Sequence, residues 1–278
     1  MELRITTLIE NQGDDKKSLL YEHGFSLYIE FDQKKFLFDT GQTGSFLENA
    51  KKLEISVKDI DFFIVSHGHY DHSSGVLDLM NLFKEKKKMY LGEGFFQEKY
   101  KILEDGTYKY NGNSYRESDL LKEKIQIERV TDDITYITDK ILLFKNFHQT
   151  WELEHVNPKF YLKKGDTYIQ DEFQDEISLG LLTKKGLVLI VGCSHPGIVN
   201  IIRNVMDRID IPLYGVIGGT HLIDADERRL EKTVDELKKY QVKRMAFSHC
   251  TGQRGMEKME EAFKILFEKN HTGNIMEI

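Results

Sequence analysis

The sequence predicts an α/β protein in which short buried strands alternate with helices. Four apolar runs stop abruptly at a histidine, and a helix signal follows each of them. Short β-rich runs bounded by Gly and Ser are typical of buried strands. Strands between helices occur in both halves of the chain, and no internal repeat of fixed period is present. Together these observations favour a layered fold with its strands inside.

The composition is that of an ordinary soluble globular protein, with 40% hydrophobic and 31% charged residues. A chain of 278 residues can form one large domain or two modest ones. We predict a single domain over residues 1–278. The net charge of −7 makes nucleic acid an unexpected partner, although a local basic patch stays open.

Nothing in the sequence indicates a membrane partner. No run has the apolar length of a membrane span, and the N-terminus lacks a basic region followed by an apolar stretch. Two cysteines make no disulfide framework, which agrees with a reducing compartment. We therefore expect a cytoplasmic protein with free thiols, and the sequence leaves its oligomeric state open.

The first elements are a strand at Leu3–Ile9 and a hairpin that turns at Asp32-Gln33. Thr43–Leu53 has the spacing of a short amphipathic helix, and Val76–Phe83 that of a second one. The segment 89–150 is the least regular part of the chain. It predicts several strands, including a hairpin at Glu104–Gly106. No linker sets this segment off, so we interpret it as an elaboration of one domain.

The second half is predicted to contain three helices and a final strand. Asp171–Glu176 precedes them with four acids in six positions, for which we favour a solvated loop. The helices are expected to begin at Ser194, at a cap in Asp224–Glu227 and at Met256, and the last is expected to reach Lys269. Ile275–Ile278 is expected to add an edge strand.

The four predicted strands that end at a histidine indicate one shared site. They end at His67, His195, His221 and His249, and these four places hold six of the ten histidines. In open α/β layers, sites are built at the rim where strands end and helices begin.

The first of these places reads His67-Gly68-His69-Tyr70-Asp71-His72. His67 and His69 are two residues apart, so in an extended loop both imidazoles point to the same side. Asp71 and His72 come as the chain turns into a helix and can aim at a second point. Imidazole nitrogen with carboxylate oxygen is a ligand set for zinc, iron or manganese. The alternative, a polar loop with accidental histidines, is disfavoured because histidine is scarce elsewhere.

HGHYDH resembles the metal-binding signature HxHxDH of the metallo-β-lactamase superfamily. The similarity extends to Phe38–Gly41 upstream and to the later histidine segments in the expected order. GCSHPGIVN, GGTHL and HCTG resemble one subfamily, labelled 7,8-dihydropterin-6-yl-methyl-4-(β-D-ribofuranosyl)aminobenzene 5'-phosphate synthase. The resemblance implies an αββα metallo-β-lactamase sandwich in which the elaborated middle segment, about 89–150, covers the cleft.

The resemblance also implies a ligand set. His67, His69 and His195 would take one divalent metal, and Asp71, His72 and His249 another. Zinc is expected first, with iron and manganese as alternatives, and one ion or two can be bound. A metal-bound hydroxide would attack a phosphorus or carbonyl centre, which places Asp71 among the catalytic residues. Asp39 matches a carboxylate that supports a ligand, with a turn aspartate as the alternative.

The sequence departs from the superfamily pattern at Gly219-Thr220-His221, where many members have a metal-bridging aspartate. An imidazole cannot bridge as a carboxylate does. We predict that His221 binds one metal, donates to the substrate or acts as an acid/base group, with a buried structural role as the alternative. Cys193 and Cys250 could be soft ligands, but small buried cysteines are the favoured interpretation.

Two predicted helix starts favour anions, because their backbone N–H groups are free. We therefore predict that Ser73 and Thr251 contact the substrate, together with Thr220. Arg254 is predicted to contact a phosphate, and the alternative is that Arg254 is simply an exposed surface residue. We predict a metal-dependent hydrolase or group-transfer enzyme for a small anionic substrate, which the subfamily label links to pterin phosphates. A generic phosphodiesterase or lactonase-like hydrolase is one alternative. An iron-containing redox protein or a non-catalytic metal-binding protein is another.

Overall fold

The computed structural model describes residues 2–13, 18–121 and 124–278. The chain forms two compact units. Unit 1 comprises Met1–Val130, Asn157–Glu176 and His271–Ile278, and unit 2 comprises Thr131–Val156 and Ile177–Asn270. Strands and helices alternate in both units, as predicted. That residues 1–278 work as one domain stays a prediction.

Unit 1 contains a seven-stranded mixed sheet. Its strands are, in spatial order, β18 (Ile275–Glu277), β1 (Leu3–Ile9), β2 (Ser26–Phe31), β3 (Lys34–Phe38), β4 (Phe62–Ile64), β5 (Lys87–Gly92) and β8 (Ile125–Val130). The strands from β18 to β3 are antiparallel, and those from β3 to β8 are parallel. The predicted first strand, hairpin and final edge strand are confirmed. Asp32 and Gln33 have φ of 50° and 63°, as a two-residue hairpin turn requires.

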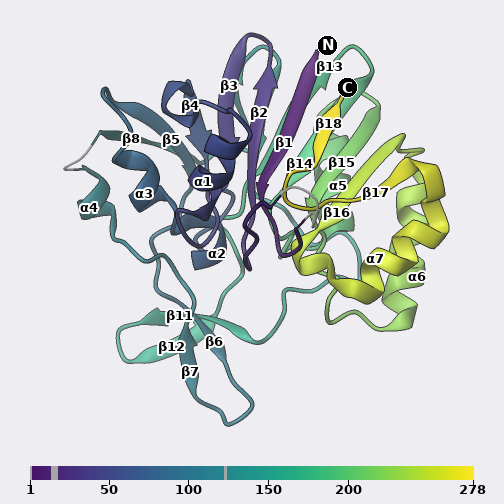
Figure 1. Ribbon diagram of the computed structural model, residues 1–278. Coiled ribbons are helices and arrows are strands. Elements are labelled where there is room, and N and C mark those ends of the chain that lie inside the picture. Colours follow the sequence, from purple (N-terminus) through teal and green to yellow (C-terminus); the bar gives the residue numbers. More distant parts are fainter. Residues whose placement is uncertain (1, 14–17, 122–123) are drawn as a thin grey trace. The chain divides into compact units, whose positions relative to one another are not determined.

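Short helices cover one face of this sheet (Figure 1). They are α1 (Ser45–Lys52), α2 (Tyr70–Ser73), α3 (Val76–Met80) and α4 (Glu117–Leu121), with a 3₁₀ turn η1 (Val57–Asp59). Phe46 of α1 and Leu79 of α3 pack into one apolar core with Phe63 of β4. The helix predicted over Val76–Phe83 ends at Met80, although Phe83 is still buried.

A separate four-stranded antiparallel sheet completes unit 1 (Figure 1). It consists of β12 (Thr167–Gln170), β11 (Phe160–Lys164), β6 (Lys99–Ile102) and β7 (Tyr108–Tyr110), and its β6–β7 hairpin is the one predicted at Glu104–Gly106. Tyrosine rings pack across its strands, and the rings of Tyr108 and Tyr168 stack 3.8 Å apart. The segment 89–150 thus contributes strands to three sheets, and its position over a cleft stays a prediction.

The acidic segment Asp171–Glu176 is not a solvated loop, so that prediction was wrong. Nζ of Lys99 lies 2.7 Å from Oδ2 of Asp171 and 2.8 Å from Oδ1 of Asp175, and all three side chains are at most 2% exposed. A buried ammonium needs nearby counter-charges, and this segment supplies two. Burial alone would lower the pKa of Lys99, but the carboxylates of Asp175 and Asp171 outweigh it and raise that pKa.

We expect Lys99→Met to destabilise the protein by roughly 3–5 kcal/mol, because it leaves two buried carboxylates without their cation. The free energy of unfolding in urea measures this loss. Lys109→Met is the matched control, since Lys109 is exposed on β7 of the same sheet. Equal unfolding free energies for the two variants would show that the buried ion pairs contribute nothing.

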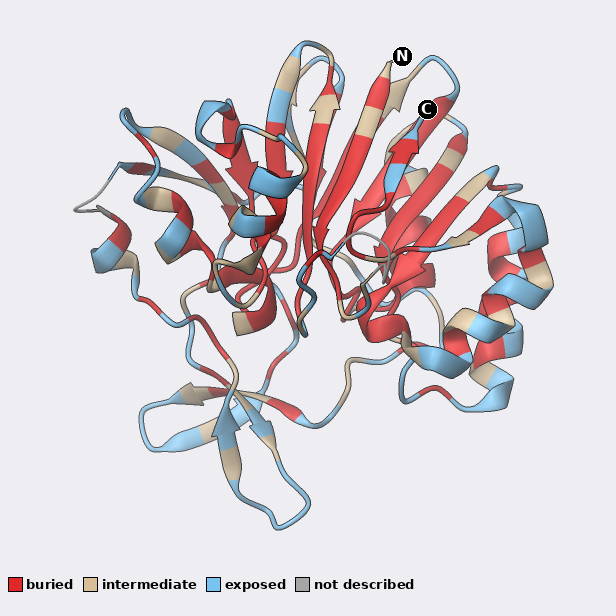
Figure 2. Ribbon diagram, in the orientation of Figure 1, coloured by how far each residue is buried: buried red, intermediate tan, exposed pale blue. Residues whose placement is uncertain are grey.

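Unit 2 contains the second seven-stranded mixed sheet. Its strands are, in spatial order, β17 (Phe267–Lys269), β16 (Arg244–Ser248), β15 (Leu213–Gly219), β14 (Gly186–Val191), β13 (Ser178–Thr183), β10 (Ile141–Phe144) and β9 (Ile134–Thr138). The strands from β14 to β17 are parallel, and the others are antiparallel. In Figure 2 the strands of this sheet are mostly buried.

Three helices pack their apolar sides on this sheet, namely α5 (Ile198–Arg208), α6 (Glu227–Lys239) and α7 (Gly252–Phe263). The short 3₁₀ turns η2 (His249–Thr251) and η3 (Lys264–Leu266) flank α7. In Figure 1, α6 and α7 lie side by side. Asp226 caps α6 by accepting a hydrogen bond from the N–H of Arg229 at 2.7 Å, which confirms the predicted cap.

The last helix begins and ends earlier than predicted, at Gly252 rather than Met256 and before Lys269. It ends at Phe263, because Lys264 adopts a left-handed φ of 50°. The chain then forms β17, whose Phe267 is buried and pairs in register with Met245 of β16. The apolar spacing of residues 256–269 is thus shared by a helix and an edge strand. Among the described residues, no helix is long and apolar enough to cross a membrane.

Candidate metal centre

In unit 1, the ends of two parallel strands deliver the first group of polar side chains. Asp39 follows β3 directly, and His67 comes three residues after the end of β4. The chain then turns into α2, which carries Asp71 and His72. His67 and His72 are fully buried, and His69 and Asp71 are nearly so. The sequence therefore places this cluster at one edge of the sheet, as predicted.

In each of the rings of His67, His69 and His72, one nitrogen lies within hydrogen-bond distance of a neighbouring polar side chain. Nδ1 of His72 lies 2.6 Å from Oδ2 of Asp39. Nδ1 of His67 lies 3.0 Å from the hydroxyl of Ser66, and Nε2 of His69 lies 3.1 Å from the amide of Asn111. The other nitrogens face inward: Nε2 of His67 and Nδ1 of His69 are 3.1 Å apart. Nε2 of His72 is 3.7 Å from Oδ2 of Asp71.

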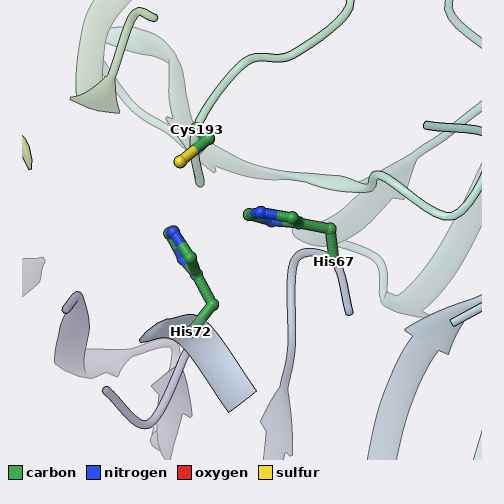
Figure 3. A group of neighbouring side chains, drawn as sticks. All are labelled: His67, His72 and Cys193. Atoms are coloured by element: carbon green, nitrogen blue, oxygen red, sulfur yellow. The ribbon is translucent and has the colours of Figure 1, made fainter. Parts of the chain in front are cut away.

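This arrangement suits a divalent metal ion. Burial, followed by the neighbouring rings of His72 and His69, holds the pKa of His67 well below its ordinary value. The neutral imidazole that results is the form that binds metals. The ring centroids of His67 and His72 are 4.3 Å apart, and Figure 3 shows both rings pointing to a common region. Three imidazoles and a carboxylate in six residues form a donor set that zinc, iron or manganese accepts.

Asp39 lies where a supporting carboxylate is needed. It is fully buried and accepts hydrogen bonds from the N–H of Ser66 at 2.7 Å and from its hydroxyl at 2.9 Å. With the contact to His72, these bonds fix both the ring and the chain that leads into the histidine loop. Its φ of 62° is a left-handed conformation that costs energy for a residue other than glycine. The local geometry therefore fits the predicted supporting role.

Unit 2 delivers a second group from three neighbouring parallel strands. β14, β15 and β16 end shortly before His195, His221 and His249, so the three histidines come from the same edge of this sheet. The rings of His195 and His221 lie 4.5 Å apart. His221 and His249 have φ of 47° and 57°, so both sit in left-handed backbone. Such strained residues cluster at functional sites.

His221 is held in its neutral form. Burial, together with Arg229 as the next cause, lowers its pKa to about 4. Its backbone N–H points to Sγ of Cys250 at 3.3 Å. Cys193 and Cys250 are both buried, and no disulfide joins them.

The predicted substrate residues occupy different environments. Thr220 and Thr251 are buried, and their hydroxyls lie 3.1 Å apart. The hydroxyl of Ser73 donates to the carbonyl of His69 at 2.8 Å and also lies 2.7 Å from Oδ1 of Asn113. Arg254 is 63% exposed and lies 3.4 Å from Glu227. Their contact with a substrate stays a prediction.

Four residues near these clusters were missed by sequence reasoning. Oδ2 of Asp175 accepts a hydrogen bond from the N–H of Gly68, between the first two histidines, at 2.8 Å. Nε2 of His23 lies 3.2 Å from Oδ2 of Asp71. Asn111 contacts His69, and Glu154 contacts the helix that follows His195. None of them belongs to a motif, so no local signal could have identified them.

The side chain of Glu154 is buried against the first turn of α5. Its carboxylate accepts hydrogen bonds from the N–H groups of Val199 at 3.1 Å and Asn200 at 2.8 Å. A Cβ at Gly197 would lie only 2.2 Å from Oε2 of Glu154, so glycine is required for this close approach. Burial raises the pKa of Glu154 to about 7, although the two N–H groups oppose the shift.

We expect Glu154→Gln to change the pH dependence of stability. The pKa of Glu154 rises from 4.5 in the unfolded chain to about 7 in the folded protein. Glu154 therefore contributes stability that is complete below about pH 4.5 and is lost as the pH rises through about 7. The unfolding free energy of the wild type should fall relative to that of the variant by roughly 3 kcal/mol over this range. Urea unfolding of both proteins with chelator, from pH 4.5 to 8, tests this. Parallel pH profiles would contradict it.

Residues 22–211 match the family described as the metallo-beta-lactamase superfamily. The chain is 32% identical over 289 residues to the 7,8-dihydropterin-6-methyl-4-(beta-D-ribofuranosyl)-aminobenzene-5'-phosphate synthase of Methanocaldococcus jannaschii, covering 99% of this chain and 96% of that protein. An uncharacterized protein of the same organism is 29% identical, covering 99% of this chain and all of that protein. The chain therefore belongs to the metallo-beta-lactamase superfamily.

A solved structure supports the same assignment. The crystal structure of a metal-dependent hydrolase of the beta-lactamase superfamily superposes with a TM-score of 0.86 and 28% sequence identity. The match covers 100% of this chain and 99% of that one. The predicted metallo-β-lactamase fold is thereby confirmed. The fold and the histidine clusters together indicate an enzyme superfamily with divalent metal binding, while the identity of the metal stays a prediction.

Proposed function

We propose that this protein is a metal-dependent hydrolase or group-transfer enzyme that acts on a small phosphorylated or otherwise anionic metabolite. The observation that carries the proposal is the 3.1 Å approach of Nε2 of His67 to Nδ1 of His69, two rings that are both buried. Two lone-pair nitrogens so close together must share a proton or a cation. The supporting groups on their far sides favour the cation.

The proposed ligand sets follow the signature of the superfamily. His67, His69 and His195 would hold one ion, and Asp71, His72 and His249 the other. A bound divalent ion would supply a water with a pKa near about 7 and would polarise an oxygen of the substrate. Asp39 orients the ring of His72 through the 2.6 Å contact to its Nδ1. Zinc is our first choice of metal, with iron and manganese as alternatives.

His221 is proposed to serve the chemistry without completing the first ligand set. As a neutral imidazole it can accept a proton from the substrate or donate a hydrogen bond to it. Two observations support this role: the ring of His221 lies 4.5 Å from that of His195, a proposed ligand, and its backbone has a left-handed φ of 47°. An aspartate that bridges two ions is absent from this position, so the second ion should be the weaker one.

The proposed substrate class is supported by the curated relative. The name of the archaeal synthase, 32% identical to this chain, describes a phosphorylated product that contains a pterin. A phosphorylated pterin compound is accordingly the first substrate to test. Ser73, Thr220, Thr251 and Arg254 are the proposed substrate contacts.

The test begins with the metal content of protein purified without added metal. Chelator-stripped protein, with and without added zinc, manganese or iron, is then assayed on a phosphodiester, a phosphomonoester, a lactone and a phosphorylated pterin. We expect bound metal and turnover that disappears on stripping and returns with one ion. Turnover that survives stripping would refute the proposal. Iron with oxygen consumption would favour the redox alternative, and metal without turnover the non-catalytic one.

A further inference from the structure

We propose that Asn111 is a positioning residue for His69: its amide oxygen accepts the Nε2–H of that ring and thereby leaves Nδ1 to a metal ion. The inference rests on the proposed metal site and adds a residue from outside the signature. Asn111 follows β7, so the four-stranded sheet would help to select the form of a metal ligand.

The backbone of Asn111 is fixed on two sides. Its N–H donates to the carbonyl of Lys99 on β6 at 3.0 Å, and its carbonyl accepts from the N–H of Tyr70 at 3.2 Å. Tyr70 is the residue after His69. The side chain of Asn111 is therefore held beside that ring by the sheet on one side and by the histidine loop on the other.

The ring of His69 is itself confined. Phe160 of β11 lies 5.2 Å away between ring centroids, and Phe173 lies 5.3 Å away. Between these two neighbours, the two nitrogens of the ring point to different groups. Nδ1 faces Nε2 of His67 at 3.1 Å, and Nε2 is covered by the amide of Asn111 at 3.1 Å. Nδ1 is therefore the atom of His69 that can share an ion with His67.

This assignment determines what Asn111 must do. A neutral imidazole that binds a metal through Nδ1 carries its proton on Nε2, so the atom opposite Nε2 must accept. In the structure, Nδ2 of Asn111 faces Nε2 of His69. Oδ1 of Asn111 is buried and has no hydrogen-bond partner among the described residues. The two ends of an amide are distinguished only by their partners. Turning the amide over brings Oδ1 to Nε2, where it accepts the N–H of the ring.

The other two rings show the same design. Nδ1 of His72 faces the carboxylate of Asp39, and Nδ1 of His67 faces the hydroxyl of Ser66. Metal-binding histidines commonly donate their second N–H to a carboxylate or carbonyl oxygen, which fixes the tautomer and the ring orientation. Asn111 completes this set for His69.

The test measures zinc affinity of chelator-stripped protein by competition with a chromophoric chelator. Asn111→Leu removes the acceptor, and we expect zinc affinity to fall by about 10–100-fold. Asn111→Asp keeps an acceptor but cannot donate, so its affinity should remain within about threefold of the wild type, by the same reasoning. Tyr110→Phe is the control, because it removes only the hydrogen bond from this loop to the carbonyl of Asn113.

A spectroscopic measurement separates positioning from a general structural role. Long-range ¹H–¹⁵N spectra of the zinc-loaded wild type, assigned with the His69→Ala variant, should show the proton of His69 on Nε2. Wild-type affinity in Asn111→Leu would overturn the inference, and so would an Asn111→Asp variant as weak as Asn111→Leu. If Asn111→Leu does not fold, the comparison of Asn111→Asp with the wild type and the position of the proton still decide. A wild type that binds none of zinc, manganese and iron would overturn the proposed function and this inference together, whereas the other outcomes affect Asn111 alone.

Discussion

The His69→Ala variant should bind no metal in the first ion position and should show no measurable turnover. The substitution removes a nearly buried ring whose Nδ1 lies 3.1 Å from Nε2 of His67. The remaining nitrogens cannot complete a three-ligand set, and an ion held by two imidazoles exchanges readily. The loss of zinc affinity should exceed the 10–100-fold that is typical of losing a supporting group.

Metal content by elemental analysis and turnover on the substrate found by the screen measure this result. His155→Ala is the matched control, because it makes the same chemical change at an exposed loop histidine. We expect that control to keep both metal and activity. A His69→Ala protein with wild-type metal content would show that the HGHYDH loop is not the metal site.

The His221→Ala variant should keep its fold and at least one metal ion but lose turnover by roughly 10²–10⁴-fold, the factor typical of removing an acid/base group. The retained ion follows from the proposed ligand set, in which His67, His69 and His195 remain intact. Turnover is expected to fall because the variant lacks the half-buried ring of His221, which lies 4.5 Å from the ring of His195. The pKa of His221, about 4, keeps this ring neutral and able to accept a proton.

Measuring both metal content and turnover in the two variants distinguishes a metal ligand from an acid/base group. His69→Ala should lose metal and activity together, whereas His221→Ala should lose activity alone. Thermal unfolding of both variants shows whether either has lost its fold. Full activity in His221→Ala would mean that the residue is only structural. Loss of all metal would instead make it an essential ligand.

Local pattern was enough to predict the strands and their ends. A strand that is buried on both faces is apolar throughout, and the chain must leave the sheet where polar residues begin. β14, β15 and β16 were predicted for this reason, and the histidines after them fell at the expected places. The histidine loop could also be predicted from local pattern, because its proposed ligands are separated by at most five residues and their spacing reflects local geometry.

Local pattern failed where a side chain depends on a partner far away in the sequence. Asp171 and Asp175 look like members of a solvated acidic loop, yet both are buried against Lys99, more than 70 residues earlier. The apolar spacing of residues 256–269 is that of one helix, but Phe267 instead belongs to β17, which pairs with the edge of β16. In both cases a tertiary interaction outweighed the local preference.

The sequence by itself determined which chemistry this protein can carry, because imidazoles and carboxylates at strand ends are a property of residue type and spacing. It also determined the family, through the HGHYDH loop and the later histidine segments. Only the tertiary structure decided which nitrogen of each ring faces inward and which groups hold it there. Asn111 lies 42 residues from His69 along the chain, and Glu154 lies 46 residues before Asn200. A hydrogen bond depends on distance and direction in space, and separation along the chain predicts neither.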